Sequence, residues 1–315
     1  MRSLRLLIAL LCALPAAAGA AGKSYPAKPI KMVVAFLPAT LSGVTARLLS
    51  ERLTQTWGMS VIVQKIEGGA GGIAAMTVAK APPDGYVLFC STDAALTTLP
   101  AAHADLPYDP LKDFTPISLL ARSANVLVVD RWNQARSVQD LVAAAKARPG
   151  KLTFASAGIE TSQHLAGELF KSVAGIDLKH VPYQGGPLGV RALVEGKVSM
   201  MFANVHDALP SIHKGELHAL AVSSAERWPT LPSVPTMAEA GFAGFDAVAW
   251  VGLVGPAGLP AEVVHTLQQQ IAKILVEPKV RAKLADFALE PVASSPEALE
   301  ARIRTEIAQR EKLMR

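Results

Sequence analysis

The sequence predicts an α/β protein of two lobes, each built on a mainly parallel sheet that is flanked by helices. Short apolar runs typical of strands alternate with amphipathic helical patterns, which is the order of βαβ units. A hydrophobic content of 50% against 18% charged residues fits strands that are buried on both faces. After a predicted leader about 295 residues remain, more than one ordinary core needs, so two lobes are expected.

Residues 1–20 are typical of a cleavable secretory leader. Arg2 and Arg5 precede the apolar run 6–14, and Ala18, Gly19 and Ala20 follow it. The run is too short to span a bilayer, and no later stretch reaches the roughly 18 apolar residues that a spanning helix needs. The mature chain is therefore expected to be exported and soluble.

Apolar runs and helical periodicity predict the elements in chain order. The expected strands are 30–36, 61–63, 86–90, 117–120, 126–129, 152–155, 180–181, 198–202, 219–222 and 248–253. The expected helices are 44–57, 73–80, 138–146, 162–174 and 188–195, and then 260–276, 279–287 and 296–314 in the strand-poor C-terminal part. Pro260 and Pro296 stand where first-turn prolines belong, and Ser295 is a plausible cap.

Turn-rich connectors bracket the middle of the chain, at 107–110 and 229–235. We therefore expect residues 123–225 to form the second lobe, and residues 21–122 and 226–315 to combine into the first. A chain that crosses twice between lobes makes a hinge. The cleft between two such lobes is where strand carboxyl ends and helix N-termini converge, so it is the expected ligand site.

Charge and cysteine content exclude several classes of protein. Arg2 and Arg5 supply two of the net charge of +5, so about +3 remains without the leader, and the charges are dispersed. Without a basic run and with few aromatic residues, nucleic-acid binding has no support. Cys90 is the one cysteine outside the leader, so no disulfide is possible within the mature chain, and we interpret it as a small buried hydrophobe.

The stretch 152–170 (LTFASAGIETSQHLAGELF) is the most informative in the chain. It is typical of a strand, a loop of small residues and a helix with one apolar face, and Thr161 and Ser162 are suitable caps. A helix start leaves backbone N–H groups unpaired, and Ser156, Thr161 and Ser162 place hydroxyls around them. The junction therefore predicts a site for an anionic oxygen. His164 either donates to a bound carboxylate or is an ordinary satisfied histidine.

A second junction has the same order. The strand 30–36 leads through Leu37, Pro38, Ala39, Thr40 and Ser42 into the helix 44–57. If the lobes face each other, two helix starts close on one anion. Ser91 and Thr92, after their strand, and Asn204, after the run 200–202, are further candidates.

The glycine-rich segment 68–74 admits two interpretations. Residues 69–74 satisfy G-x-G-x-x-A after a strand and before a helix, with Asp93 about 24 residues on, as in dinucleotide-binding loops. However, residues 64–67 separate the strand from the glycines, and Glu67 repels a pyrophosphate. We therefore interpret the segment as a turn that packs a helix against the sheet, and expect no cofactor.

No pattern supports a metal or a hydrolytic centre. The seven histidines are scattered, and the spacings of His206, His213 and His218 do not place them on one helix turn. No serine lies in a G-x-S-x-G context. We expect neither a metal site nor catalytic residues.

Several segments together resemble the Bug family, the extracytoplasmic solute receptors of tripartite tricarboxylate transporters in Gram-negative bacteria. They are residues 155–170, 82–86, 106–114, 181–183, 217–224 and 234–241, and the resemblance covers nearly the whole mature chain. It implies a periplasmic-binding-protein fold of type II that closes on a small carboxylated solute and delivers it to a membrane permease. Family members hold carboxylates by loop backbone, hydroxyls and water, which implies the ligand-binding residues Phe36, Pro38, Ala39, Thr40, Ser42, Ser91, Thr92, Ser156, Ala157, Gly158, Thr161, Ser162, His164, Tyr183 and Asn204.

Two positions depart from the family pattern. Gly43 and Ala203 stand where the family usually has an acidic residue, and both positions are expected at the cleft. Loss of two carboxylates makes a pocket less negative, which disfavours a ligand amino group and favours a plain or aromatic acid. Ala39 and Thr40 replace two glycines, which narrows how closely the backbone approaches a ligand.

The sequence therefore predicts a monomeric periplasmic receptor that captures a small organic acid for the membrane subunits of a transporter. Two alternatives remain open. One is a periplasmic enzyme or a dinucleotide-binding oxidoreductase that uses the same cleft. The other is a ligand sensor for a signalling kinase.

Overall fold

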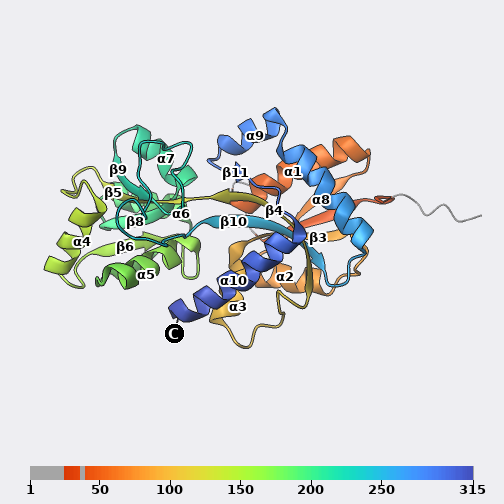
Figure 1. Cartoon of the computed structure of the whole chain (residues 1–315), viewed down its shortest axis with the longest axis horizontal. Coiled ribbons are helices and arrows are strands. Elements are labelled where there is room, and N and C mark those ends of the chain that lie inside the picture. Colours follow the sequence, from red (N-terminus) through yellow and green to blue (C-terminus); the bar gives the residue numbers. More distant parts are fainter. Residues whose placement is uncertain (1–24, 36–39, 315) are drawn as a thin grey trace, which may run out of the picture.

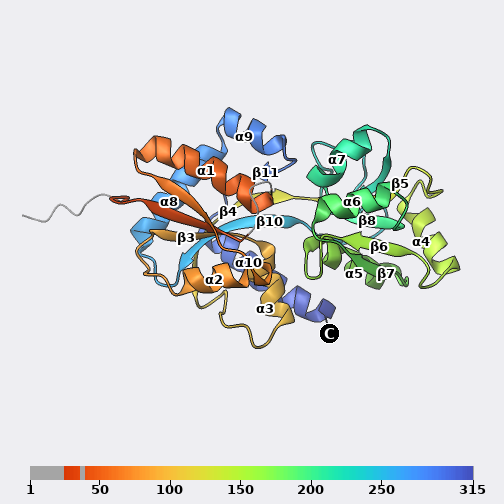
Figure 2. The same ribbon diagram turned by 180° about the vertical axis from the view of Figure 1, so that it is seen from behind.

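The computed structural model describes residues 25–35 and 40–314, which form two lobes joined by extended crossing segments (Figure 1). The view from behind shows the same two bodies with helices on both sides of each sheet (Figure 2). The two-lobed α/β fold expected from the sequence is confirmed. The expected leader at 1–20 lies outside the described residues. Within the described residues, no helix is long and apolar enough to cross a bilayer.

The first lobe holds a six-stranded sheet in the order β11-β4-β10-β3-β1-β2. Its strands are β1 (Ile30–Val34), β2 (Val61–Lys65), β3 (Val87–Thr92), β4 (Phe114–Ser123), β10 (Ala249–Pro256) and β11 (Glu290–Pro291). One face packs against α1 (Leu41–Trp57), α8 (Ala261–Leu275) and α9 (Pro278–Ala285). The other face packs against α2 (Gly72–Ala79), η2 (Ala94–Thr98), α3 (Leu99–Ala102) and α10 (Pro296–Met314), and the short turn η1 (Gly69–Gly71) precedes α2.

The second lobe holds a five-stranded sheet in the order β7-β6-β8-β5-β9. Its strands are β5 (Asn125–Asp130), β6 (Thr153–Ser156), β7 (Lys179–Pro182), β8 (Met200–Asn204) and β9 (Leu217–Val222). The helices α4 (Val138–Ala147) and α5 (Ser162–Ala174) cover one face. The helices α6 (Gly186–Val194) and α7 (Val205–His213) cover the other.

Burial on both faces explains why the strands are continuous apolar runs in the sequence. Successive side chains of β8 alternate between the two cores: Met200 and Phe202 pack on the side of α4 and α5. Met201 and Ala203 pack on the side of α6 and α7. Ala203 is fully buried there. This departure from the family pattern therefore lies inside the lobe, whereas the sequence analysis expected it at the cleft.

Most strands of each sheet run in one direction, as expected, although the pairing in both sheets is mixed. β1 pairs parallel with β2 and β3, and β6 pairs parallel with β7 and β8. β10 and β5 pair antiparallel with both of their neighbours. The reason is that the chain crosses between the lobes twice. β5 begins at the hinge and leads into the second lobe, and β10 begins at the hinge and leads back into the first. Both strands are therefore antiparallel to their neighbours, which end at the hinge.

The return crossing lies later than the predicted boundary between residues 225 and 226. Trp228 and Val234 are buried in the core beneath α6 and α7. Met237 and Phe245 are buried in the core beneath α4 and α5. We therefore place the return to the first lobe near Val248, because the intervening segment packs with the second lobe.

The glycine-rich turn packs a helix, as the preferred interpretation of its sequence required. Gly71 has a positive φ of 102°, and a Cβ there would lie 3.1 Å from the Ala95 Cβ and 3.3 Å from the Ala35 Cβ. Ala74, Ala75 and Val78 of α2 are then buried against the sheet. The absence of a side chain at Gly71 thus lets α2 and η2 approach the end of β1.

Candidate functional site

The strand ends that carry the predicted site residues lie at the hinge edge of each sheet. In the first lobe, Thr92 at the end of β3 pairs with Val251 near the start of β10. In the second, Asn204 at the end of β8 pairs with Asn125, the first residue of β5. Since β10 and β5 both begin at the hinge, these strand ends lie where the two lobes meet.

Many polar groups of the loop between β6 and α5 form hydrogen bonds within the second lobe. The Ser156 hydroxyl accepts the Gly158 N–H (3.1 Å) and lies 2.6 Å from Nε2 of His180. The Ala157 N–H donates to Oε1 of Gln163 at 2.9 Å, and the Glu160 N–H donates to Nδ1 of His164 at 3.2 Å. Ser156, Ala157 and Gly158, which were predicted to bind ligand, also use these groups to fix the shape of the loop.

Thr161 caps α5 as predicted. Its Oγ1 accepts the His164 N–H at 3.3 Å and donates to the Gly158 carbonyl at 2.7 Å. Within the described chain, the N–H groups of residues 159, 161, 162 and 163 and the Ser162 hydroxyl have no hydrogen-bond partner. These donors surround the N-terminus of a helix of 13 residues, where the backbone dipole favours a negative charge. The start of α5 therefore offers the unpaired donors that a carboxylate needs.

Two histidines lie beneath this loop. The rings of His164 and His180 are 4.2 Å apart between centroids, and His180 also stacks on Phe154 at 4.8 Å. Burial lowers the pKa of His180 to about 4, with a further contribution from neighbouring His164, and burial also lowers the pKa of His164. Because Nδ1 of His164 accepts the Glu160 N–H, only Nε2 is left to donate, and it lies 3.9 Å from Oε1 of Glu168. His164 thus holds the loop in place through its hydrogen bond with the Glu160 N–H.

The first-lobe junction is described in part, because Phe36, Pro38 and Ala39 lie outside the described residues. Thr40 caps α1, and its Oγ1 accepts the Gly43 N–H at 3.4 Å. Ser42 is fully buried, and its hydroxyl has no hydrogen-bond partner in the described chain. Ser91 is also buried and donates to the Thr92 carbonyl at 2.8 Å.

Tyr183 and Asn204 border the second-lobe loop. The Tyr183 N–H donates to the Ser156 carbonyl at 3.0 Å, which joins the segment after β7 to the end of β6. The Asn204 side-chain oxygen is buried and has no partner in the described chain. Asn125, paired with Asn204 across the strands, was not predicted; its Nδ2 donates to the Ala247 carbonyl at 2.8 Å.

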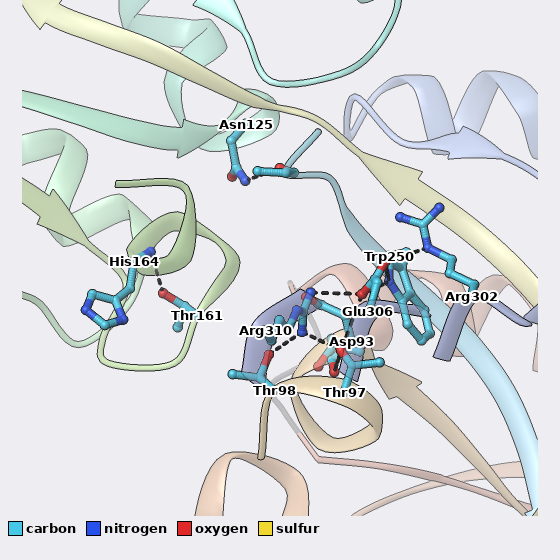
Figure 3. A network of polar contacts seen from close by, with 12 residues as sticks. Asp93, Thr97, Thr98, Asn125, Thr161, His164, Trp250, Arg302, Glu306 and Arg310 are labelled. Atoms are coloured by element: carbon cyan, nitrogen blue, oxygen red, sulfur yellow. Dashed lines mark hydrogen bonds and ion pairs between the residues drawn. The ribbon is translucent and has the colours of Figure 1, made fainter. Parts of the chain in front are cut away.

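A charged network on α10 was also missed by sequence reasoning. Figure 3 shows it opposite Thr161 and His164, with Asn125 between the two groups. Arg310 binds the carboxylates of Asp93 (2.8 Å) and Glu306 (2.9 Å) and also contacts Thr97 and Thr98. Burial raises the pKa of Glu306, although Arg310 and Arg302 oppose that rise. Only the i,i+4 spacing of Glu306 and Arg310 is visible in the sequence; their partner Asp93 is more than 200 positions away.

A cavity of about 680 Å³ lies between α5 and α10, with Gly244 and residues 246–248 completing its wall. Of the predicted site residues that the structure describes, Ser162 alone lines it. The other described ones lie on the strand ends and loops given above, so the cavity and the predicted site meet at the start of α5. Among the described residues, no group of three histidine, cysteine, aspartate or glutamate side chains is placed to hold a metal ion.

The fold and this site define a two-lobed solute-binding protein of the periplasmic type. Residues 45–315 match the model of the tripartite tricarboxylate transporter family receptor. The chain therefore belongs to this receptor family, as its resemblance to the Bug family indicated.

Relatives and solved structures agree with this assignment. The chain is 33% identical to protein BugT of Bordetella pertussis over 92% of this chain and 90% of that one. An R. palustris structure with adipate has a TM-score of 0.82 at 35% identity, covering 92% of this chain and 97% of that one. MatC from Rhodopseudomonas palustris with bound malate has a TM-score of 0.79 at 28% identity, covering 92% and 100%. The periplasmic binding protein BugD has a TM-score of 0.78 at 30% identity, covering 92% and 97%.

Proposed function

We propose that this receptor captures a small organic acid between its lobes and delivers it to the membrane subunits of a tripartite tricarboxylate transporter. The observation that supports this most is the start of α5, where four backbone N–H groups and the Ser162 hydroxyl have no partner in the described chain. A carboxylate accepts such bonds without needing an arginine, and a charged hydrogen bond contributes more than a neutral one. The relatives solved with adipate and malate support an acid as the ligand.

The ligand is a plain or aromatic acid without an ammonium group. Gly43 stands at the start of α1, where the family pattern has an acidic side chain, so this junction has no carboxylate at that position to pair with an ammonium. The chain acts as an exported periplasmic monomer that requires no cofactor. Membrane subunits encoded beside the gene would support transport, whereas an adjacent sensor kinase would favour signalling.

The acid is identified by thermal shift and calorimetry on the mature protein. At least one member of a panel of di-, tri- and aromatic carboxylates is expected to raise the melting temperature, because a ligand that binds only the folded state stabilises it by mass action. Amino-acid analogues of the best acid should bind more weakly. A flat response to a broad panel would argue against the proposal.

The location of the site is tested with a double substitution, Thr161→Ala together with Ser162→Ala. It should weaken binding of the identified acid at least about tenfold, the loss expected for one or two hydrogen bonds to a charged group. The matched control is Ser137→Ala, because Ser137 caps α4 in the same lobe by accepting the Asp140 N–H. The control should lose stability and keep its affinity. Equal affinity in the double variant would place the site elsewhere.

A further inference from the structure

The cavity between α5 and α10 has one wall on each lobe. Ser162, Leu165 and Leu169 of α5 form the second-lobe wall, and residues of α10 from Ala301 to Lys312 form the first-lobe wall. Figure 1 shows the C-terminal end of α10 reaching toward the second lobe. At about 680 Å³, the volume falls within the range of pockets that hold small molecules. An occupant would therefore contact both lobes at once.

The lining combines apolar side chains with hydrogen-bond donors from both lobes. Leu165, Leu169 and Val248 supply the apolar part. On the α5 wall lies Ser162, whose hydroxyl is unpaired in the described chain, beside the unpaired N–H groups at the start of α5. On the α10 wall lies Lys312, which is exposed and has no ion pair or hydrogen bond in the described chain. Two carboxylates also line the cavity: Asp246, which is exposed, and Glu306, which is paired with arginines.

Both arginines that line this wall, Arg302 and Arg310, already form ion pairs. Arg310 is held by Asp93 and Glu306, and Nε of Arg302 lies 2.8 Å from Glu306, which also accepts the indole N–H of Trp250. Figure 3 shows these groups converging on one side of α10. The network fixes the helix to Asp93 after β3, to η2 and to β10, so this wall belongs to the first lobe. Among the described residues of this wall, Lys312 is then the cation without an ion pair, and it is free to meet a ligand.

We propose that the cavity between α5 and α10 is a subsite for the apolar body and far carboxylate of an elongated acid, with Ala301 and Lys312 as residues that determine specificity. The inference rests on the proposed function, because the near carboxylate of the same acid binds at the start of α5. The apolar side chains accommodate a chain or ring of several carbons, and Lys312 pairs with the far carboxylate. A short acid occupies the start of α5 alone and does not reach α10.

The test is a length series. Affinities of α,ω-dicarboxylates from four to ten carbons and of monocarboxylates of equal length are measured by calorimetry on the full mature chain. The wild-type chain should prefer the longer dicarboxylates. Ala301→Phe, which fills the cavity, and Lys312→Gln, which removes the charge, should each weaken the long dicarboxylates by about tenfold, the loss expected for one charged contact. The four-carbon acid should change less than twofold.

Two controls separate this effect from damage to the helix. Ala298→Phe lies on the same helix at an exposed position outside the cavity, and Lys279→Gln removes an exposed charge on α9. Both should bind every acid as the wild type does. If acids bind but neither chain length nor the two α10 substitutions change the affinity, the subsite is wrong and the proposed function stands. If the wild-type chain binds no acid, the proposed function fails and the subsite with it.

Discussion

Ser156 shows which contacts of a side chain the sequence alone does not reveal. Its hydroxyl has one proton and two lone pairs, and three groups engage it: the Gly158 N–H, the Gly158 carbonyl and Nε2 of His180. All three are satisfied when Nε2 of His180 carries the proton, so this hydroxyl is fully engaged in the described chain. His180 lies 24 residues further along, on the neighbouring strand β7, and no pattern within 152–170 points to it.

The histidine pair makes stability depend on pH. The pKa of His180 is lowered to about 4 by burial, whereas an unfolded histidine titrates near 6.5. Between these values the unfolded chain binds a proton that the folded chain does not, so stability falls as the pH falls from about 6.5 to 4. His180→Gln should flatten the melting temperature against pH over this window. His164, Glu168 and Lys171 also act on His180 and leave a residual slope.

The control for this prediction is a histidine away from the stack. His265→Gln, on an exposed position of α8, should keep the wild-type pH profile. If His180→Gln and wild type lose stability in parallel between pH 6.5 and 4, the neutral state of His180 does not contribute to folding.

Elements with a cap and a clear apolar period were predicted closely. The bounds of α5 and α10 are those expected, because Thr161 starts one helix and Pro296 stands at the start of the other. The helix α7 was missed: it follows β8 directly, has no side-chain cap and contains Pro210. The mixed pairing was missed for a different reason, since periodicity reports which faces are buried and not the direction in which a strand runs.

The packing of α5 on β6 depends on the small size of Gly167. A Cβ at this position would lie 2.3 Å from a ring carbon of Phe154, which is fully buried. Alanine favours a helix by about 1 kcal/mol over glycine, but forced overpacking of a core costs about 1–3 kcal/mol. Gly167→Ala should therefore lower the melting temperature and the denaturant midpoint. It should also disturb the ring stack of Phe154, His180 and His164, and so weaken ligand binding.

A second glycine provides the comparison for α2. Gly72 has helical backbone angles, and a Cβ there would meet Leu99 at an ordinary 3.6 Å. Gly72→Ala should be neutral or stabilising in the same denaturant titration. Equal losses in the two variants would mean that contact with Phe154 does not decide the outcome.

At the scale of the whole molecule, the lobes also touch outside the hinge. His103, just after α3 in the first lobe, places Nε2 2.9 Å from the Glu160 carboxylate in the second. Glu160 has a positive φ of 65°, unusual for a residue with a side chain, and its N–H is held by His164. The loop that carries the unpaired donors of α5 is thus linked directly to the opposite lobe.

Breaking this contact should raise the free energy of closing the lobes. His103→Ala should increase the radius of gyration of the ligand-free chain in small-angle scattering and weaken acid binding, by at most about fivefold because the pair is partly exposed. Glu160→Gln should behave similarly, because it replaces the carboxylate that His103 contacts. His265→Ala is the control, because His265 is exposed on α8 and distant in sequence from both partners. Identical scattering and affinity in His103→Ala and wild type would show that the hinge alone sets the balance between open and closed forms.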